Sequence, residues 1–320
     1  MSGQDEWAVG IDIGGTMTKL GLFDEEGRLL TKHTMPTPSS SQGPVDISYI
    51  EEGVAVLGRQ QGLSGFVPER VGIGMPMLVT PQGAITRCFN VLMDDAQMHA
   101  SLARMFPDAP TAIVNDANAA VLGEYWQGAL RGCSSGIMLT LGTGVGGGLM
   151  AGGRLVSGAH GAAGEIGHIT VNPAESERCA CGRMGCLEQY VSATGLVRSA
   201  RQAILSGRPT SLEEHALDAK TVCDAARAGD ALARHLLDGY ALQLARGLVT
   251  LAAVFDPEVF VLGGGLSLGA DVFLEGVRET FRAEALDACR RTPILCAELG
   301  NDAGMYGAAY LVLRGRVVLS

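Results

Sequence analysis

The stretch EIGHITVNPAESERCACGRMGCLE, which runs from Glu165 to Glu188, groups four potential metal ligands in a short span. Three are cysteines within eight residues, and the fourth is a histidine eleven positions before the first of them: Cys179, Cys181, Cys186 and His168. Three thiolates and one imidazole complete a tetrahedral zinc set. The stretch therefore predicts a zinc site, and its two bordering carboxylates, Glu165 and Glu188, remain available for a polar ligand.

The composition is that of a globular protein with room for two lobes. The chain has 320 residues, of which 47% are apolar and 18% charged, so a sizeable core can form. Its 45 glycines are about twice the ordinary share of roughly 7%. The glycines gather in loops, which suggests that the backbone approaches a ligand closely there.

Charge and hydropathy argue against nucleic-acid and membrane partners. The formal net charge is −10, without the Lys/Arg cluster that a nucleic-acid surface needs. The longest apolar run, Gly247 to Phe255, is too short to span a bilayer, and the first residues, MSGQDEWAVG, lack the apolar segment of a signal peptide. We therefore expect a cytoplasmic protein with reduced cysteines. The isolated cysteines are expected to be small buried residues: Cys88, Cys133, Cys223, Cys289 and Cys296.

A glycine turn near the N-terminus predicts a phosphate site. Trp7 to Ile13 (WAVGIDI) is an apolar strand with Asp12 near its end, and Gly14-Gly15-Thr16 lead towards a second strand, Leu20 to Phe23. Bare N–H groups in a glycine-rich turn bind phosphate. An adjacent carboxylate suits Mg²⁺, which prefers oxygen ligands. A plain hairpin turn is the alternative for this stretch taken alone.

The same pattern of strand, glycine turn and strand returns in mid-chain. Ile137 to Leu141 is a predicted strand, GTGVGGG follows, and Leu149 to Leu155 is a second predicted strand. This repetition suggests an internal duplication with one phosphate-binding hairpin in each lobe. The second copy has Thr140 in place of Asp12, so only the first offers an acid for a metal ion.

Asp116 is the candidate for acid–base chemistry. The strand Thr111 to Val114 runs into Asn115 and Asp116, and the helical stretch ANAAVLGEYW follows. Open α/β sheets place ligand-binding groups at the carboxyl ends of their strands. We expect Asp116 to be the N-cap of this helix and to be held ionised there, with a low pKa. Simple capping is the alternative, and Asn115 beside it suits a hydroxyl-rich ligand.

The remaining elements follow from hydrophobic periodicity and turn residues. Met35 to Pro44 is expected to be a loop, as is the stretch MPMLVTPQG after the strand at residues 71–74. The other predicted elements are helices at 45–58, 230–255, 271–286 and from Asp302 onwards, and strands at 258–262 and 294–296.

Four motifs, in this order, resemble those of the ROK-family sugar kinases: GIDIGGTMTKLGLFD, NDANAAVLGE, LGTGVGGGLMAGGRL, and GEIGH with CACGRMGCLE. Each glycine loop is a weak signal alone, whereas the last pair at this spacing is specific. The resemblance covers nearly the whole chain. It implies an α/β protein with the actin-like ATPase (ribonuclease H-like) fold, in which two lobes flank a central cleft. The expected lobes are residues 1–117, completed by 303–320, and residues 118–302, which carry the zinc site.

The resemblance also implies a role for each motif. Mg²⁺ and the phosphates of ATP would lie against Asp12, Gly14, Gly15, Thr16 and Lys19, and against Gly142, Thr143 and Gly144. The adenosine would border Gly264 and Gly265. The sugar would contact Asn90, Asn115, Asp116, Glu165, His168 and Glu188, with Asp116 as general base. Structural Zn²⁺ would be held by His168, Cys179, Cys181 and Cys186.

The expected activity is transfer of the γ-phosphate of ATP to a hexose hydroxyl, most simply the 6-hydroxyl of glucose, by a homodimer. The sequence departs from the family pattern where Pro76–Thr80 reads PMLVT in place of PGPVD, and where Asn90–Asp94 reads NVLMD in place of NLPGW. Both segments come near the sugar in this family. N-acetylmannosamine, N-acetylglucosamine, an amino-hexose or fructose therefore remains an alternative acceptor, and polyphosphate an alternative donor.

Two other classes are weighed against the kinase. The family includes sugar-sensing repressors with a helix-turn-helix before the first glycine motif, but Asp12 lies close to the first residue, which disfavours that reading. A non-catalytic sugar-binding protein of the same fold is disfavoured because the phosphate turns and Asp116 are intact.

Overall fold

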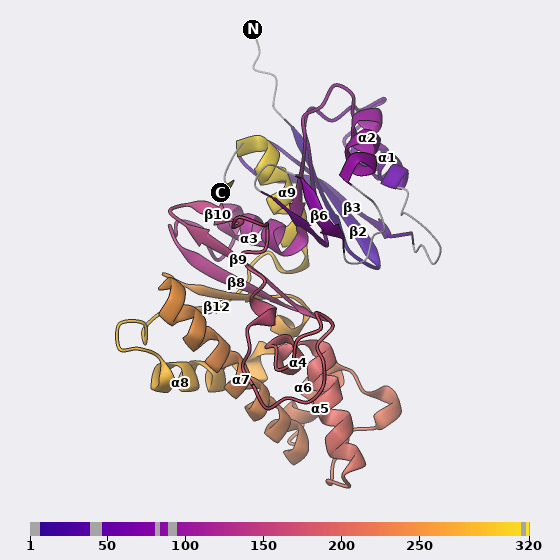
Figure 1. Cartoon of the computed structure of the whole chain (residues 1–320). Coiled ribbons are helices and arrows are strands. Elements are labelled where there is room, and N and C mark those ends of the chain that lie inside the picture. The colour runs from indigo at the N-terminus through magenta and orange to yellow at the C-terminus, as the bar shows by residue number, and fades with distance from the viewer. Residues whose placement is uncertain (1–6, 39–46, 81–83, 89–94, 315–317, 320) are drawn as a thin grey trace. The chain divides into compact units, whose positions relative to one another are not determined.

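The computed structural model describes residues 7–38, 47–80, 84–88, 95–314 and 318–319 (Figure 1). The chain forms two compact units. The first comprises Met1–Ser134, Gly148–Gly164 and Glu298–Ser320, and the second comprises Ser135–Gly147 and Glu165–Ala297. The division predicted at residues 117 and 118 concerns the lobes of the fold and stays a prediction.

The first unit is built on a five-stranded sheet with the strand order β3-β2-β1-β4-β7. Its strands are β1 (Ala8–Ile13), β2 (Met17–Phe23), β3 (Leu29–Pro36), β4 (Val71–Met75) and β7 (Thr111–Asn115). β1, β2 and β3 pair antiparallel, whereas β4 and β7 run parallel to β1. The carboxyl ends of β1, β4 and β7 therefore share one edge of the sheet, where Asp12 and Asn115 lie.

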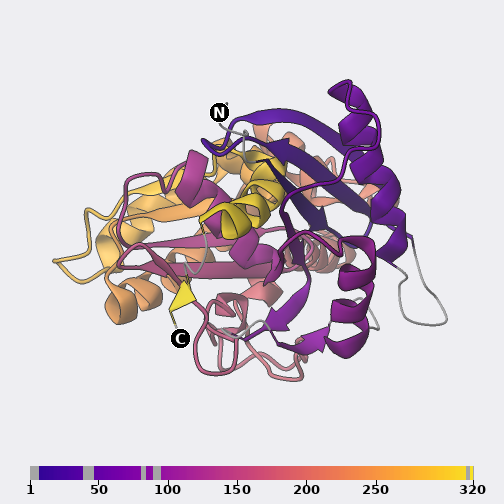
Figure 2. The ribbon, with the colours of Figure 1, turned by 90° about the horizontal axis from the view of Figure 1, so that it is seen from above.

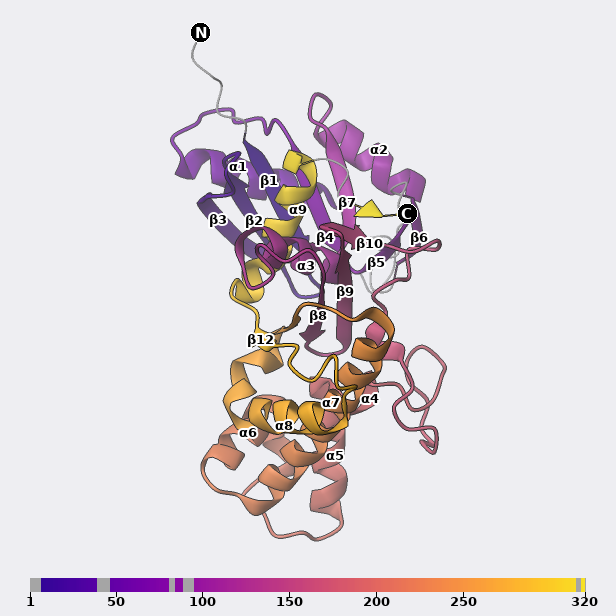
Figure 3. The same cartoon turned by 90° about the vertical axis from the view of Figure 1, so that its left-hand side faces the viewer.

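Helices cover both faces of this sheet. α1 (Ile50–Gln60) and α2 (Asp95–Met105) lie on one side of the strands and α9 (Ala303–Arg314) on the other (Figures 1 and 2). α9 packs directly on β1 and β4 (Figure 3). Two glycines make this approach possible, because a Cβ on Gly10 or Gly72 would lie within 2 Å of a carbonyl oxygen of α9. α3 (Asp116–Gln127) packs in turn on α9.

The second unit contains three parallel strands, β8 (Gly136–Leu141), β11 (Phe260–Gly263) and β12 (Ile294–Cys296). β9 (Val145–Ala151) follows β8 in the sheet order, and the chain leaves the second unit within it, after Gly147. In the first unit, β10 (Arg154–Val156) pairs antiparallel with β9, and β13 (Val318–Leu319) pairs parallel with β10.

Helices lie on one side of the strands of the second unit (Figure 1). They are α4 (Glu188–Val191), α5 (Ala193–Leu205), α6 (Ala219–Arg227), α7 (Ala231–Phe255) and α8 (Leu274–Glu284). α7 begins where the Asp230 carboxylate accepts the N–H of Ala233 at 2.8 Å. It ends at Asp256, whose φ of 49° breaks the helix.

Most of the predicted elements are present, and several boundaries are wrong. The predicted strand Leu149–Leu155 is two strands, β9 and β10, joined by a turn in which Gly152 and Gly153 have positive φ. The helix predicted at 271–286 is a 3-10 helix, Gly265–Val272, followed by α8. Neither difference moves a predicted site residue to another segment.

Other elements were not predicted at all. β3 occupies residues 29–36, whose side chains alternate between half-buried and exposed, so its hydrophobic signal is weak. The loop predicted after the strand at residues 71–74 is wrong in part, because this stretch contains β5 (Met77–Val79), which forms a two-stranded sheet with β6 (Ile85–Cys88). α2 was also missed, because turn-forming residues around it obscure its periodicity.

Candidate active site and metal centre

The first glycine turn has the form of a ligand-binding hairpin between β1 and β2. The N–H of Gly14 donates to the carbonyl of Met17 at 3.1 Å, and the hydroxyl of Thr37 donates to the carbonyl of Gly14 at 2.8 Å. Gly15 is exposed, and a Cβ added there would meet no atom within 4 Å. Because Gly15 also lacks a positive φ, nothing in the fold itself demands a glycine. This bare turn fits the close approach of a phosphate.

Asp12 lies beside this turn in a strongly acidic setting. Its carboxyl packs against Gly304 at the start of α9, where an added Cβ would lie 2.6 Å from Asp12 Cγ. The pKa of Asp12 is raised to about 6: burial is the largest cause, the charge of Lys19 opposes it, and the charges of Asp116 and Asp302 add smaller upward contributions. A half-buried carboxyl with two acidic neighbours fits a site for a hard cation such as Mg²⁺.

Asn115 and Asp116 make different contacts at the start of α3. Asn115, and not Asp116, is the N-cap: its Oδ1 accepts the N–H of Asn118 at 3.0 Å, and its Nδ2 donates to the carbonyl of Met77 at 3.1 Å. Asp116 is the first residue of the helix and accepts the N–H of Ala117 at 2.9 Å.

The low pKa predicted for Asp116 is also wrong. Burial raises its pKa, and the backbone hydrogen bond from Ala117 only partly opposes this effect. The capping position that would have stabilised the anion belongs to Asn115. Asp116 is therefore a half-buried carboxyl with a raised affinity for a proton.

Asn301 and Asp302 lie in this region but were not predicted as site residues. The carbonyl of Asn301 accepts a hydrogen bond from Lys19 Nζ. Asp302, the next residue, forms an ion pair of 2.6 Å with Lys32. The stretch LGNDAG (residues 299–304), which contains them, is typical of a turn in the sequence. Their place beside Lys19 depends on how α9 packs on the sheet.

The second glycine turn is held by the segment that begins α4 and α5. The N–H of Gly142 donates to the carbonyl of Gly144 at 3.0 Å, as in the first hairpin. The carbonyl of Gly142 accepts the N–H of Ala193, and that of Thr143 accepts the hydroxyl of Thr194, both at 2.8 Å. A Cβ on Gly142 would meet nothing nearer than 4.0 Å, so space for a ligand lies there too.

A cavity of about 590 Å³ opens beside this second turn, a volume typical of small-ligand sites. Gly264 has a φ of 82°, and a Cβ there would lie 2.5 Å from the Leu141 carbonyl, so the fold requires this glycine. Gly265 lines the cavity and would meet nothing within 4 Å, which leaves room for a ligand. The lining residues are Gly142, Thr143, Ala193, Asp218, Ala219, Lys220, Cys223, Asp224, Arg227, Gly265, Leu266, Leu268 and Gly269.

The contribution of α6 to this cavity was not predicted. Lys220 and Asp224 form an ion pair of 2.6 Å on α6, and Arg227 pairs with Asp224 at 2.7 Å and with Asp271 at 2.5 Å. In the sequence, these charged residues are typical of an ordinary solvent-exposed helix face. Only the packing of α6 beside the 3-10 helix Gly265–Val272 brings them to the cavity.

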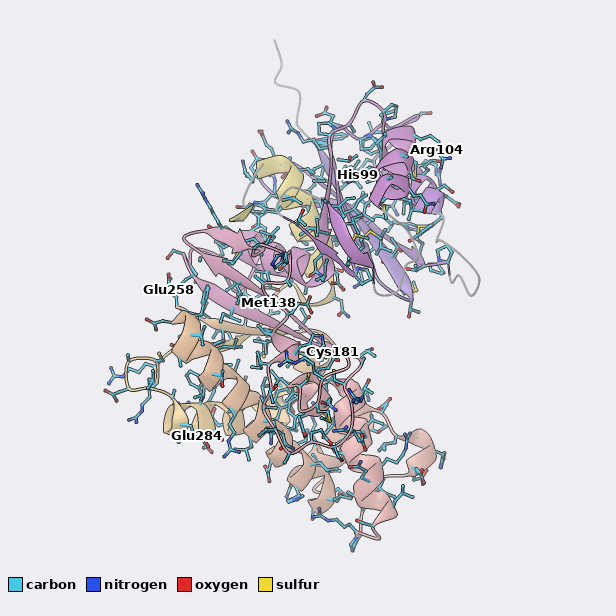
Figure 4. All side chains as sticks on the ribbon, viewed as in Figure 1. His99, Arg104, Met138, Cys181, Glu258 and Glu284 are labelled. Atoms are coloured by element: carbon cyan, nitrogen blue, oxygen red, sulfur yellow. The ribbon has the colours of Figure 1, made fainter. Side chains whose placement is uncertain are left out.

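The four predicted zinc ligands come together in the second unit. Their ligand atoms all lie within 4.8 Å of one another. His168 Nδ1 is 3.8 Å from Cys179 Sγ, and the sulfurs of Cys181 and Cys186 are 3.6 Å apart. Zinc–sulfur bonds of about 2.3 Å give tetrahedral edges of about 3.8 Å, so this set fits zinc. Cys181, labelled in Figure 4, lies on the loop before α4.

The two bordering glutamates are placed differently. Glu165 Oε2 lies 3.8 Å from Nε2 of His168, so the imidazole presents one nitrogen to the cysteines and the other to this carboxylate. Glu188 Oε1 lies 3.6 Å from Cys179 Sγ, and its Oε2 accepts the N–H of Val145 at 2.9 Å. Both carboxylates thus remain outside the ligand set.

Of the two segments that depart from the family pattern, the structure describes residues 76–80 but not residues 90–94. Met77 is fully buried in the core of the first unit, and its carbonyl orients Asn115. Its side chain is therefore part of the packing beneath the predicted sugar site. Asn90, the predicted sugar contact, and the rest of residues 90–94 lie outside the described residues.

Comparisons with known proteins agree on one family. The ROK family profile matches residues 8–315. A glucokinase of Halalkalibacterium halodurans is 36% identical over 317 residues, 96% of this chain and 95% of that protein. An N-acetyl-D-glucosamine kinase of Pectobacterium atrosepticum is 32% identical over 95% of this chain and 98% of its own. The crystal structure of a ROK family glucokinase from Streptomyces griseus in complex with glucose and AMPPNP matches with a TM-score of 0.79 and 34% identity, covering 97% of this chain and 100% of that one.

The fold and these likenesses define a sugar kinase with the actin-like ATPase fold, as the sequence motifs predicted. The chain belongs to the ROK family. No helix among the described residues has the length and apolar character needed to cross a bilayer.

Proposed function

We propose that the chain is an ATP-dependent hexose kinase that phosphorylates the 6-hydroxyl of glucose or a related hexose, with Asp116 as general base. The observation that carries this proposal is the pairing of two acids in the first unit. Asp116 is half-buried at the carboxyl edge of the sheet, and its charge raises the pKa of Asp12, which lies beside the phosphate turn. This pairing supports a proton acceptor for the sugar hydroxyl next to a proposed site for phosphate and metal.

The proposed reaction is a direct phosphoryl transfer. As the hexose oxygen bonds to the γ-phosphorus, the bond from that phosphorus to the β,γ-bridging oxygen breaks, ADP leaves, and the hydroxyl proton passes to the Asp116 carboxylate. Such a transfer depends more on alignment and charge compensation than on a strong base. The raised pKa of Asp116 brings the carboxylate nearer to the operating pH and suits it to accept this proton.

The remaining site residues would bind and orient the substrates. Asp12 would hold Mg²⁺, which supplies charge compensation when bound, and the turns at Gly14–Thr16 and Gly142–Gly144 would receive the phosphates. The cavity lined by Gly265 and α6 would take the adenosine. The sugar would contact Asn90, Asn115, Asp116, Glu165, His168 and Glu188. His168 Nε2, which faces away from the cysteines, is the nitrogen suited to a sugar oxygen.

Zinc would be structural, because four protein ligands leave no open position. We also infer a homodimer in the cytoplasm. The cytoplasmic placement is supported by cysteine thiols that suit metal binding in a reducing compartment. Light scattering of the purified protein tests the dimer.

The general-base assignment is tested by Asp116→Asn. We expect turnover to fall by roughly 10²- to 10⁴-fold, because the proton loses its acceptor, while glucose still binds in isothermal titration. Asp108→Asn, an exposed acid of the same unit, is the matched control and should keep full activity. Phosphorylation at the wild-type rate by Asp116→Asn would rule out the base role.

A kinase for an N-acetyl-hexose is the second candidate. It is favoured by the N-acetyl-D-glucosamine kinase among the relatives and by the altered segment at Met77, which orients Asn115. Comparing kcat/KM for glucose, N-acetylglucosamine, N-acetylmannosamine, glucosamine and fructose decides between them. The same panel with polyphosphate in place of ATP tests the donor, and absence of turnover with every pair would favour a sugar-sensing role.

A further inference from the structure

Three anchors of the second glycine turn come from one short segment, which begins at a zinc ligand. Cys186 is the last predicted ligand, and Glu188, Ala193 and Thr194 follow it within eight residues. Their contacts are with successive parts of the turn: the carboxylate of Glu188 with the N–H of Val145, Ala193 with the carbonyl of Gly142, and Thr194 with the carbonyl of Thr143.

Glu188 is the residue of this segment that contacts both the second glycine turn and the predicted zinc ligands. Its Oε2 is 2.9 Å from the backbone nitrogen of Val145, and its Oε1 is 3.6 Å from Cys179 Sγ. The carboxylate also explains Gly144. A Cβ there would lie 2.5 Å from Glu188 Oε2, whereas Gly144 has no positive φ that would demand a glycine.

We propose that Glu188 is a positioning residue for the phosphate turn at Gly142–Gly144, in addition to its predicted sugar contact, so that nucleotide binding depends on it even without sugar. This inference rests on the proposed function, in which that turn receives the phosphates of ATP. It assigns different tasks to the two oxygens of one carboxylate.

The division of tasks follows from the contacts. Oε2 accepts the N–H of Val145 and fixes the turn, since a hydrogen bond to a charged acceptor is among the stronger ones. When the Cys179 sulfur is a metal-bound thiolate it carries no proton, so Oε1 is left to accept a sugar hydroxyl. A sugar on Oε1 and a nucleotide on the turn would then both depend on the same side chain.

The test measures MgADP binding to the zinc-loaded full chain by isothermal titration, without sugar. Glu188→Ala removes the anchor, and we expect the Kd for MgADP to rise roughly tenfold, as loss of one charged hydrogen bond implies. Glu188→Gln keeps an oxygen for the Val145 N–H and should restore the Kd to within about threefold of wild type. Elemental analysis confirms that both variants keep their zinc.

Two further variants separate the nucleotide and sugar effects. Thr194→Val removes another anchor of the turn and should weaken MgADP binding alone. Glu165→Gln removes the other predicted sugar carboxylate and should weaken glucose binding alone, while Glu188→Ala weakens both. Wild-type MgADP affinity in Glu188→Ala would overturn the positioning role.

The proposed function fails by a different result from the same titrations. Unchanged glucose affinity in both Glu165→Gln and Glu188→Ala would remove the sugar-site assignment, whatever the nucleotide does. If Glu188→Ala loses its fold, Glu188→Asp takes its place, because it keeps the charge but withdraws it by one methylene from Val145. The expected rise in Kd is then the same, and its absence overturns the inference.

Discussion

Glu124, in the third turn of α3, is a fully buried carboxylate whose partners are backbone N–H groups. It accepts from Ala129 at 2.7 Å, from Glu298 at 3.1 Å and from Leu299 at 2.8 Å. Gly128 lies beside it, where an added Cβ would lie 2.1 Å from the carboxylate and would force it to move. Glu124 thus fixes Glu298 and Leu299, which precede Asp302 and the start of α9.

We expect Glu124→Gln to lower the free energy of unfolding by about 2–4 kcal/mol, since the amide cannot accept all three N–H groups and turns a donor towards them. Urea unfolding followed by circular dichroism measures the change. Glu52→Gln, at an exposed position of α1, is the matched control and should change the stability by less than about 0.5 kcal/mol. Equal stability of the two variants would mean that Glu124 is not the anchor of this segment.

The pH dependence of activity follows from the direction of the Asp116 shift. Asp116 must be ionised to accept a proton, and burial raises its pKa, so kcat/KM should fall as the pH falls through that raised pKa. The acid limb then lies above the ordinary aspartate range near 3.9. The sign for stability is opposite: a raised pKa means that the folded state binds the proton more tightly, so this group favours folding as the pH falls.

Initial rates between about pH 3 and pH 8, with thermal unfolding recorded at each pH, test this expectation. Activity should decline at acid pH before the protein unfolds. An acid limb centred at or below about pH 3.9, the ordinary aspartate value, would contradict the raised pKa of the base.

At the scale of elements, two sets of contacts hold the segment from Glu165 to Glu188, here called the zinc segment. His168 and the three cysteines form the first set. In the second set, Arg198 of α5 contacts Glu177 at 2.7 Å and Glu175 at 3.3 Å, while Tyr190 donates to Glu175 at 2.6 Å. The Tyr190 hydrogen bond is the largest cause that lowers the pKa of Glu175 to about 2. Because this second set needs no metal, part of the segment should stay ordered without zinc.

We therefore expect about one zinc per chain in protein purified without chelator, and a loss of most of it in Cys181→Ser. That variant should unfold at a lower temperature, because metal binding contributes to folding. Cys296→Ser, outside the ligand set, should keep both the zinc and the melting temperature. Zinc-free wild-type protein with unchanged melting would contradict a structural metal.

The same segment shows what the sequence can and cannot predict. The ligand spacing predicted all four residues that the structure brings together as a candidate metal site, because the ligand types and the short loop restrict which residues can meet. The contact of Glu188 with Val145 could not be foreseen, since it depends on how α4 packs against a turn far away in the sequence. The place of Asp116 after a strand is as predicted, but the helix N-cap is Asn115, one residue earlier.

At the scale of the whole chain, the internal repetition predicted two similar hairpins, and both are present. Gly14 and Gly142 each donate an N–H to a carbonyl across their turn, and β1 and β8 each have a parallel neighbour, β4 and β11. Edge strands such as β3 were missed because neither face is deeply buried. Local sequence patterns likewise do not predict how α9 packs on the sheet. That packing explains why glycines occur at positions 10 and 72.

Gly72 gives the sharpest test of that packing. A Cβ at this position of β4 would lie 1.8 Å from the carbonyl oxygen of Ala308, and backbone atoms cannot move aside cheaply. Gly72→Ala should therefore push α9 off the sheet and lower the free energy of unfolding by about 2–4 kcal/mol. Gly239→Ala is the matched control: it lies within α7 with open space at its Cβ, and should stabilise by about 0.5–1 kcal/mol. Because α9 also carries Gly304 against Asp12, Gly72→Ala should weaken MgADP binding as well. A variant as stable as the wild type would show that α9 does not lie this close to β4.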